Sequence, residues 1–184
     1  MCDSGAMVKS RFMSPRDITQ AEILAICKLK NQSWLHSLES QLAWWESNTA
    51  DDDLFVNLMC NDSILAFLRL RSRTVSVSGE HIDVLCATEV CVDAARQGQG
   101  LGKLLMSKAA TRIEQTSSGI AYLLCRDTQE PFYTRCGWRR TSASLQIESS
   151  SGQGRRSLAA NERCMTFDPK ARLSGQIILF GDVF

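Results

Sequence analysis

The stretch TEVCVDAARQGQGLGKLLMSK, from Thr88 to Lys108, decides the fold of this chain. A short run rich in β-branched residues ends at Val92, three glycines follow at alternate positions, and an apolar helical period begins near Lys103. Glycine permits positive φ angles and leaves the backbone open to a ligand. A strand that turns into a helix N-terminus in this way presents several N–H groups and the positive end of the helix dipole to one point. The stretch therefore predicts a binding site for a phosphate group.

Two familiar phosphate sites do not fit this spacing. The dinucleotide fingerprint requires a glycine at the position of Lys103, and no βαβ repeat precedes the stretch. A P-loop requires four residues between its glycines and a serine or threonine after its lysine, whereas Gly98 and Gly102 enclose three residues and Leu104 follows the lysine. The spacing therefore favours neither NAD nor ATP.

Two motifs carry a resemblance to a known family. The segment RQGQGLGKLL resembles the pyrophosphate-binding motif of the GNAT superfamily of acetyl-CoA-dependent N-acetyltransferases, Gln/Arg-x-x-Gly-x-Gly/Ala, with Gly98 and Gly100 in the two small positions and Ala95 in the Gln/Arg position. The segment Pro131 to Trp138 is similar to the family's Phe-Tyr-x-x-x-Gly-Phe motif. The motifs follow one another in the family's order, and the resemblance covers roughly Leu54 to Trp138.

The resemblance implies a GNAT-type α/β fold: a mixed, mainly antiparallel sheet with helices on both faces and a split between two central parallel strands. The split is expected between the strand ending at Val92 and Ile120 to Cys125. The co-substrate is expected to be acetyl-CoA, with its pantetheine arm bonded to backbone and its pyrophosphate in the glycine turn, and no metal is expected. The residues expected to bind acetyl-CoA are Cys91, Val92, Arg96, Gln97, Gly98, Gln99, Gly100, Leu101, Gly102 and Lys103.

Acetyl transfer to an amine requires that two protons be handled, because only the neutral amine attacks and the leaving thiolate needs a proton. Glu89 lies in an apolar strand just before the turn and is the candidate for aiding deprotonation; a solvent-facing glutamate is the alternative. Tyr133 stands where the family's tyrosine acid stands, and a core tyrosine is its alternative. Cys136 is no candidate nucleophile, because no histidine is near it in sequence and direct transfer needs no covalent enzyme intermediate.

The last residues carry a further resemblance. After a predicted strand at Ile177 to Phe180 the chain ends in GDVF, which is similar to the Gly-Asp-Val-aromatic ending of the aminoglycoside 2′-N-acetyltransferases. Carried over, the resemblance implies that Asp182, the terminal carboxylate of Phe184 and Glu89 hold the amines of a cationic sugar. Buried cations need paired charges, which three anions around a polyamine supply. The alternative is that the four residues merely end a strand.

Composition limits the remaining classes of protein. A chain of 184 residues with 44% hydrophobic and 22% charged residues is expected to form one domain from residue 16 to 184, behind a flexible N-terminal extension over residues 1–15. A formal charge of +1 gives no general attraction to nucleic acid or a membrane, and without a long apolar segment a cytoplasmic location is expected. Eight cysteines without a Cys-x-x-Cys pair are expected to be mostly small buried hydrophobes, not metal ligands. The sequence leaves open whether the chain forms a homodimer.

Helices and strands are expected around the central stretch. Apolar spacing predicts two helices and strand residues predict three strands: Asp17 to Lys30 with Thr19 as N-cap, Ser37 to Trp45, Leu54 to Met59, Ile64 to Leu70 and Ile82 to Val92. Trp34, Trp44 and Trp45 are interpreted as core residues, although a segment between the first helices often forms an acceptor wall in the resembled family. Arg69, Arg71 and Arg73 alternate with apolar residues, which predicts an exposed basic face, and Asp51 to Asp53 is interpreted as a solvated charge run.

These observations predict an N-acetyltransferase that moves an acetyl group from acetyl-CoA to a primary amine of a small cationic acceptor, with an aminoglycoside-like molecule as one form of it. Two other functions stay open. In the first, the acceptor is a protein or peptide amine, and in the second, the chain is an acyl-CoA-binding module without turnover.

Overall fold

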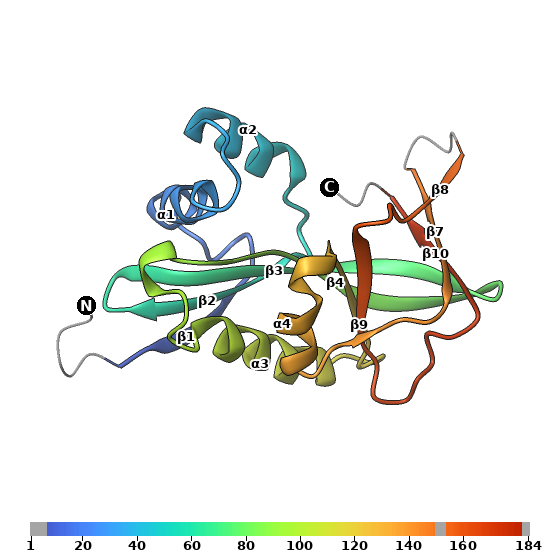
Figure 1. Cartoon of the computed structure of the whole chain (residues 1–184). Helices are drawn as coiled ribbons and strands as arrows, with labels where there is room; N and C mark the ends of the chain where they lie inside the picture. Colours follow the sequence, from blue (N-terminus) through green and yellow to red (C-terminus); the bar gives the residue numbers. More distant parts are fainter. Residues whose placement is uncertain (1–6, 150–153, 182–184) are drawn as a thin grey trace. The chain divides into compact units, whose positions relative to one another are not determined.

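The computed structural model describes residues 7–149 and 154–181 (Figure 1), and these residues form two compact units. Unit 1 comprises residues 7–71 and 87–109, and unit 2 comprises residues 72–86, 110–149 and 154–181. Three elements contribute residues to both units, because the boundaries fall inside them: β3 (Ser63–Val77), β4 (Glu80–Val92) and α3 (Leu101–Glu114). The expected single domain from residue 16 to 184 stays a prediction.

Unit 1 contains a set of antiparallel strands. Strand β1 (Lys9–Met13) pairs with β2 (Leu54–Cys60), and β2 pairs with the first part of β3. The β2–β3 connection turns at Asn61, whose φ of 52° is the left-handed conformation that asparagine tolerates in tight turns. The hairpin predicted at this point is confirmed.

The strand β1 differs from the expectation of a flexible extension over residues 1–15. Five residues of this segment, Lys9–Met13, form ladder pairs with β2, and Met13 is buried at 1% exposure. Lys9–Met13 contains too few apolar residues to predict a strand from the sequence. An edge strand pairs with one neighbour and buries one face, so few apolar residues are enough for it. Strand Lys9–Met13 therefore corrects the prediction for these five residues.

Two helices cover one face of the unit 1 strands, and the first turns of α3 lie on the opposite face (Figure 1). Helix α1 (Gln20–Asn31) starts at the predicted N-cap Thr19, which forms a capping box with Glu22. Helix α2 (Leu38–Asn48) starts at its N-cap Ser37. The core between α1, α2 and the strands consists of Met13, Ile26, Cys27, Leu29, Trp45, Phe55, Phe67 and Cys91.

Unit 2 contains the second part of β3, the first part of β4, the end of α3 and the C-terminal elements. These elements are β5 (Ala121–Arg126), the 3₁₀ turn η2 (Asp127–Gln129), α4 (Glu130–Arg135), β6 (Arg139–Arg140), β7 (Ser144–Glu148), β8 (Arg155–Ser157), β9 (Glu162–Phe167) and β10 (Gln176–Phe180). Strand β5 pairs parallel with β4 and antiparallel with β9, and β9 pairs with β6. Strand β10 pairs antiparallel with β3 and parallel with β7, which pairs with β8. The strand predicted at Ile177 to Phe180 is confirmed.

The parallel ladder between β4 and β5 comprises two residue pairs, Leu85 with Ala121 and Cys86 with Tyr122. This ladder confirms the predicted parallel neighbours on either side of a helix. The predicted split involves residues of β4 beyond Cys86, which belong to unit 1, and residues of β5, which belong to unit 2. The split therefore stays a prediction.

Mixed pairing, with mostly antiparallel and some parallel strands, together with the helices agrees with the predicted fold class. In the part of the chain that the structure describes, no helix is long and apolar enough to span a membrane. Asp182 and Phe184, which sequence reasoning assigned to the acceptor, lie outside the described residues.

Candidate active site

The glycine turn of unit 1 runs from Gln97 to Gly100 and ends at the start of α3. Gly98 has a φ of 77° and Gly100 a φ of 81°. A Cβ atom built at either glycine meets nothing within 4 Å, so crowding is not the reason for glycine here. The left-handed backbone is the reason, since it costs an L-residue roughly 1–2 kcal/mol. Both glycines are exposed, so the turn presents bare backbone to solvent.

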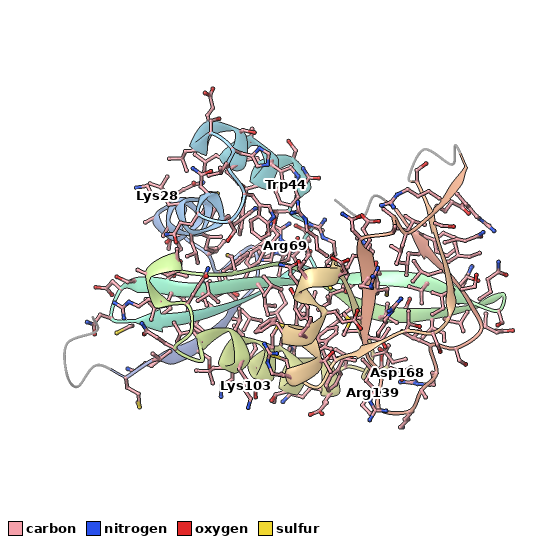
Figure 2. All side chains as sticks on the ribbon, viewed as in Figure 1. Lys28, Trp44, Arg69, Lys103, Arg139 and Asp168 are labelled. Atoms are coloured by element: carbon pink, nitrogen blue, oxygen red, sulfur yellow. The ribbon has the colours of Figure 1, made fainter. Side chains whose placement is uncertain are left out.

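The N-terminus of α3 supplies hydrogen-bond donors next to this turn. The Leu104 N–H donates to the Gly100 carbonyl over 3.0 Å, so the N–H groups of Leu101, Gly102 and Lys103 precede this intrahelical bond. Leu101 is buried and anchors the first turn, whereas Lys103 is exposed on the outer side of α3 (Figure 2). Free N–H groups, a helix dipole and an exposed cation together suit a phosphate group.

The segment before the turn is held by two side chains and one backbone carbonyl of unit 1. In the 3₁₀ turn η1 (Ala94–Arg96), the Ala94 N–H donates to Oε1 of Gln32 over 2.8 Å, and the Ala95 N–H donates to Oδ1 of Asp93 over 3.1 Å. The Asp93 N–H donates to the Leu65 carbonyl over 2.8 Å. These bonds fix the entry to the glycine turn, so less ordering is left for a ligand to impose.

Glu89 has an unusual backbone conformation near the end of β4. Its φ is 55°, a left-handed value that is rare for a residue with a Cβ and costs about 1–3 kcal/mol. Such strain persists only where surrounding contacts hold the residue, and it concentrates at functional sites. The contacts of its side chain supply that restraint.

Both carboxylate oxygens of Glu89 face buried cations. Oε1 lies 2.7 Å from Nζ of Lys30, and Oε2 lies 3.3 Å from Nε of Arg69. The side chains are almost fully buried, with exposures of 4% for Lys30, 0% for Arg69 and 7% for Glu89. A solvent-facing glutamate, the alternative reading of Glu89, does not fit these exposures.

Asp53 extends this network to a second arginine. Its Oδ2 lies 3.2 Å from Nη1 of Arg69 and 2.6 Å from Nη2 of Arg71, and its Oδ1 accepts from Nε of Arg71 over 2.7 Å. Both arginines also donate to the Asn48 carbonyl. We call Lys30, Asp53, Arg69, Arg71 and Glu89 the buried charge cluster.

Aromatic rings of α2 and β2 pack against the cations of this cluster. Nζ of Lys30 lies 4.4 Å from the centre of the Trp44 ring, and the Arg69 guanidinium lies 5.1 Å from Trp44, 4.9 Å from Trp45 and 5.3 Å from Phe55. Figure 2 shows Trp44 on α2 beside Arg69 on the sheet. Desolvated cation–π contacts of this kind contribute about 2 kcal/mol. Trp45 is a core residue as predicted, and Trp44 is half-buried over the cations. The prediction is wrong for Trp34, which is 39% exposed.

Tyr133 lies in α4 of unit 2 and is buried at 6% exposure, with the Phe132 ring at an edge-to-face distance of 5.0 Å. Burial raises the pKa of the Tyr133 hydroxyl, and the nearby Cys125 and Cys136 raise it further. A hydroxyl with a raised pKa keeps its proton at neutral pH. Tyr133 is therefore in the protonation state that a general acid requires.

The comparison with known families decides the identity of the fold. The family model described as "Acetyltransferase (GNAT) domain" matches residues 14–141, which include the glycine turn and Tyr133. The chain belongs to the GNAT acetyltransferase family. No curated protein sequence matches this acetyltransferase. Membership of the family supports the predicted acyl transfer with acetyl-CoA as co-substrate.

Solved structures share the fold at low sequence identity. The GNAT family N-acetyltransferase YhbS of Escherichia coli, solved in complex with CoA, has a TM-score of 0.67 and 15% identity, covering 96% of this chain and 92% of its own. ElaA of Escherichia coli has a TM-score of 0.63 and 15% identity, covering 88% and 100%. An acyl-CoA N-acyltransferase from Pseudomonas aeruginosa has a TM-score of 0.61 and 19% identity, covering 87% and 99%. Together with the family match, these similarities confirm the predicted GNAT-type fold.

The predicted acetyl-CoA residues of this acetyltransferase lie together in unit 1, whereas Tyr133 lies in unit 2. Cys91 is buried and Val92 half-buried at the end of β4, Arg96 is half-buried, and Gln97 and Gln99 are exposed in the turn. Burial raises the pKa of the Cys91 thiol, so this cysteine is no thiolate nucleophile at neutral pH. The backbone contact of Cys91 to acetyl-CoA stays a prediction.

Sequence reasoning missed the buried charge cluster. Arg69 was expected on an exposed basic face, yet its exposure is 0%, and Asp53 was expected in a solvated run, yet its exposure is 2%. Each charge is buried because an opposite charge from a distant segment pairs with it, and Lys30 and Glu89 are 59 residues apart. The only local signal was the lysine at the end of an otherwise apolar helical face in α1.

Within residues 7–149 and 154–181, no group of three or more His, Cys, Asp or Glu side chains is placed to hold a metal ion. Six cysteines in this range are free thiols and five of them are buried, as expected of small hydrophobes.

Proposed function

We propose that this GNAT acetyltransferase transfers an acetyl group from acetyl-CoA directly to a primary amine of a small molecule. The observation that carries the proposal is the exposed glycine turn with positive φ at Gly98 and Gly100, followed at once by the N-terminus of α3. In the proposed complex the N–H groups from Gln97 to Gly102 donate to the pyrophosphate, with Arg96 and Lys103 beside them. The backbone at Cys91 and Val92 binds the pantetheine arm as an added strand does.

The proposed reaction breaks one bond and forms one bond. The amine nitrogen attacks the thioester carbonyl, the new C–N bond forms as the C–S bond breaks, and the product is an amide and free CoA. The amine loses one proton, which Glu89 relays through water, and the CoA thiolate receives one proton from Tyr133. The Tyr133 hydroxyl carries the proton that this role requires at neutral pH, and the rise of its pKa on burial makes it a weaker acid than an exposed tyrosine.

The proposed acceptor is a small amine, and its charge needs a separate argument. The expectation of a cationic, aminoglycoside-like acceptor rested on Glu89, Asp182 and the carboxylate of Phe184. Asp182 and Phe184 lie outside the described residues, and the oxygens of Glu89 already face Lys30 and Arg69. An acceptor cation at Glu89 has to displace one of these side chains. We therefore propose a small primary amine without the restriction to aminoglycosides.

Release of free thiol from acetyl-CoA tests this proposal when a panel of acceptors is compared: simple amines, amino acids, polyamines, aminoglycosides and basic peptides. The proposal predicts turnover with small amines and little or none with peptides of matched charge. Turnover with peptides only favours a protein amine as acceptor. Binding of acetyl-CoA without thiol release from any mixture favours a binding module and contradicts the proposal.

A further inference from the structure

Glu89, the proposed proton relay, lies on β4 (Glu80–Val92) next to the proposed acetyl-CoA contacts. The pyrophosphate is proposed in the glycine turn and the pantetheine arm at Cys91 and Val92, so an arm that continues in this direction brings its thioester toward Glu89. The electrostatics of Cys91 agree with this order. Burial raises the pKa of its thiol, and the Glu89 carboxylate raises it further. The charge of Glu89 therefore acts on the part of β4 that is proposed to bind the arm.

The Glu89 carboxylate contacts a different cation with each of its oxygens. Oε1 lies 2.7 Å from Nζ of Lys30, and Oε2 lies 3.3 Å from Nε of Arg69. The two contacts come from opposite ends of the carboxylate and together fix its plane. A carboxylate has about four acceptor positions, so one cation on each oxygen leaves positions that can accept a proton from water. Glu89 is therefore held in one orientation and keeps the capacity to act as a base.

Arg69 is held in place without Glu89. Its Nη1 donates to the Asn48 carbonyl over 2.9 Å and lies 3.2 Å from Oδ2 of Asp53, and its guanidinium lies 4.9 Å from the centre of the Trp45 ring. A guanidinium fork binds a carboxylate best through two parallel bonds. The fork of Nε and Nη2 contacts Glu89 through Nε only, and Nη2 has no hydrogen-bond partner among the described residues. Without a competing cation, both oxygens of Glu89 are expected to turn onto this fork.

Lys30 is the competing cation, and its place is set by the helices of unit 1. It lies in the last turn of α1, in which Ile26, Cys27 and Leu29 are buried in the core against the strands. Its Nζ lies 4.4 Å from the centre of the Trp44 ring on α2, and the residue is exposed by only 3%. The position of the ammonium group thus depends on α1 and α2 rather than on the strand that it contacts.

We propose that Lys30 is a positioning residue for the acetyl transfer, whose ammonium group keeps Oε1 of Glu89 off the Arg69 fork and so holds the carboxylate ready for the amine proton. This inference rests on the proposed function, since it concerns the proton relay of that same reaction. Lys30 acts through Glu89 and neither gives up nor receives a proton. The proton passes from the amine through water to Glu89, as the new C–N bond forms.

Kinetics of the variant Lys30→Met with two acceptors test the inference. One acceptor is the best small amine of the panel, which is charged at neutral pH, and the other is a weakly basic, fluorinated analogue that the wild type also acetylates. Only the neutral amine attacks, so the charged acceptor depends more on the proton relay. We expect Lys30→Met to lower kcat/KM for the charged amine by about 10–100-fold, because a small misplacement of a catalytic group has an effect of this size. The loss is expected to be at least about fivefold smaller with the weakly basic amine.

A purely structural role of Lys30 lowers both rates equally, because the folded fraction of the enzyme does not depend on the acceptor. Equal losses with the two amines therefore overturn the inference, and so does a Lys30→Met variant with the rates of the wild type. Rates are divided by the number of acetyl-CoA-binding sites measured by calorimetry. The control is Lys28→Met, since this lysine of the same helix is exposed. It is expected to keep the rates of the wild type, and a Lys28→Met variant with the losses of Lys30→Met contradicts the assignment to Lys30.

A crystal structure of the wild type with CoA and the acetylated product tests the same geometry if Lys30→Met does not fold. We expect Lys30 on Oε1 of Glu89 and a water that joins Glu89 to the amide nitrogen. A Glu89 carboxylate that is bound by the Arg69 fork through both oxygens, or that points away from the amide nitrogen, overturns the inference. A wild type that acetylates no amine overturns the proposed function and the inference with it. Turnover by the wild type with equal losses in Lys30→Met overturns the inference alone.

Discussion

Replacement of Lys30 by methionine removes one cation from the buried charge cluster. Nζ of Lys30 lies 2.7 Å from Glu89, and the two side chains are exposed by only 4% and 7%. Removal of one partner of such a buried pair costs about 3–5 kcal/mol when the other is left unpaired. Arg69 remains 3.3 Å from the second oxygen of Glu89, so the lower end of that range applies. We expect Lys30→Met to lower the free energy of unfolding by about 3 kcal/mol.

Urea unfolding followed by circular dichroism measures this loss, and thermal unfolding checks it. For a chain of this size, about 3 kcal/mol corresponds to a fall in Tm of about 6–12 °C. The matched control is Lys28→Met in the same helix, where the lysine is exposed and carries no ion pair with Glu89. Lysine and methionine have similar helix propensities, so the control is expected to change stability by less than about 0.5 kcal/mol.

The stabilities of the Lys30→Met and Lys28→Met variants are compared directly. A Lys30→Met variant that is as stable as Lys28→Met refutes the reasoning that a buried ion pair holds Glu89. The double variant Lys30→Met with Glu89→Gln provides a further check, because it removes both charges of the pair. We expect it to lose less stability than the sum of the single variants, since the partners lie in direct contact.

Three further predictions concern the glycine turn, the tyrosine and a buried thiol. Gly98→Ala is expected to weaken acetyl-CoA binding by about tenfold, because positive φ costs an L-residue roughly 1–2 kcal/mol. Gly79→Ala, with a φ of 95° in the β3–β4 turn, is the control. Equal affinities of the two variants for acetyl-CoA in calorimetry contradict the assignment of the turn. Tyr133→Phe is expected to lower kcat by about 10²–10⁴-fold at unchanged acetyl-CoA affinity, and unchanged turnover where chemistry limits the rate excludes the acid role. Burial raises the pKa of Cys125 from 9.0 to about 11, so between these pH values the folded state keeps a proton that the unfolded state loses. The contribution of this thiol to stability is therefore complete below about pH 9 and is lost as the pH rises through about 11. Chemical denaturation over this range is expected to show a smaller decline for Cys125→Ala, and identical declines contradict the prediction.

Features set by neighbouring residues were predictable from the sequence. The N-cap at Thr19 follows from a Thr-x-x-Glu pattern ahead of an apolar stripe, and the structure contains the complete capping box. The glycine turn follows from the spacing of Gly98 and Gly100, both of which have positive φ. In each case a local backbone requirement selects the residue type. The sequence therefore located the start of α1 and the proposed acetyl-CoA turn.

Features set by distant partners were not predictable in the same way. Arg69 alternates with leucines, which is the pattern of an exposed face, but Asp53 and Glu89 pair with it in the interior. The burial of a charge depends on where its counter-charge lies in space, and a single sequence does not contain that distance. The left-handed backbone of Glu89 escaped prediction for the same reason, since its restraints come from Lys30 and Arg69.

The central claim is that this GNAT acetyltransferase moves the acetyl group of acetyl-CoA onto a small primary amine. The most direct test is a reaction of isotopically labelled acetyl-CoA with a panel of small primary amines, in which mass spectrometry identifies the labelled product. The account predicts that the label appears as an amide on the amine nitrogen, in a one-to-one ratio with free CoA. Labelled acetyl-CoA that binds but leaves every small amine unlabelled contradicts the account.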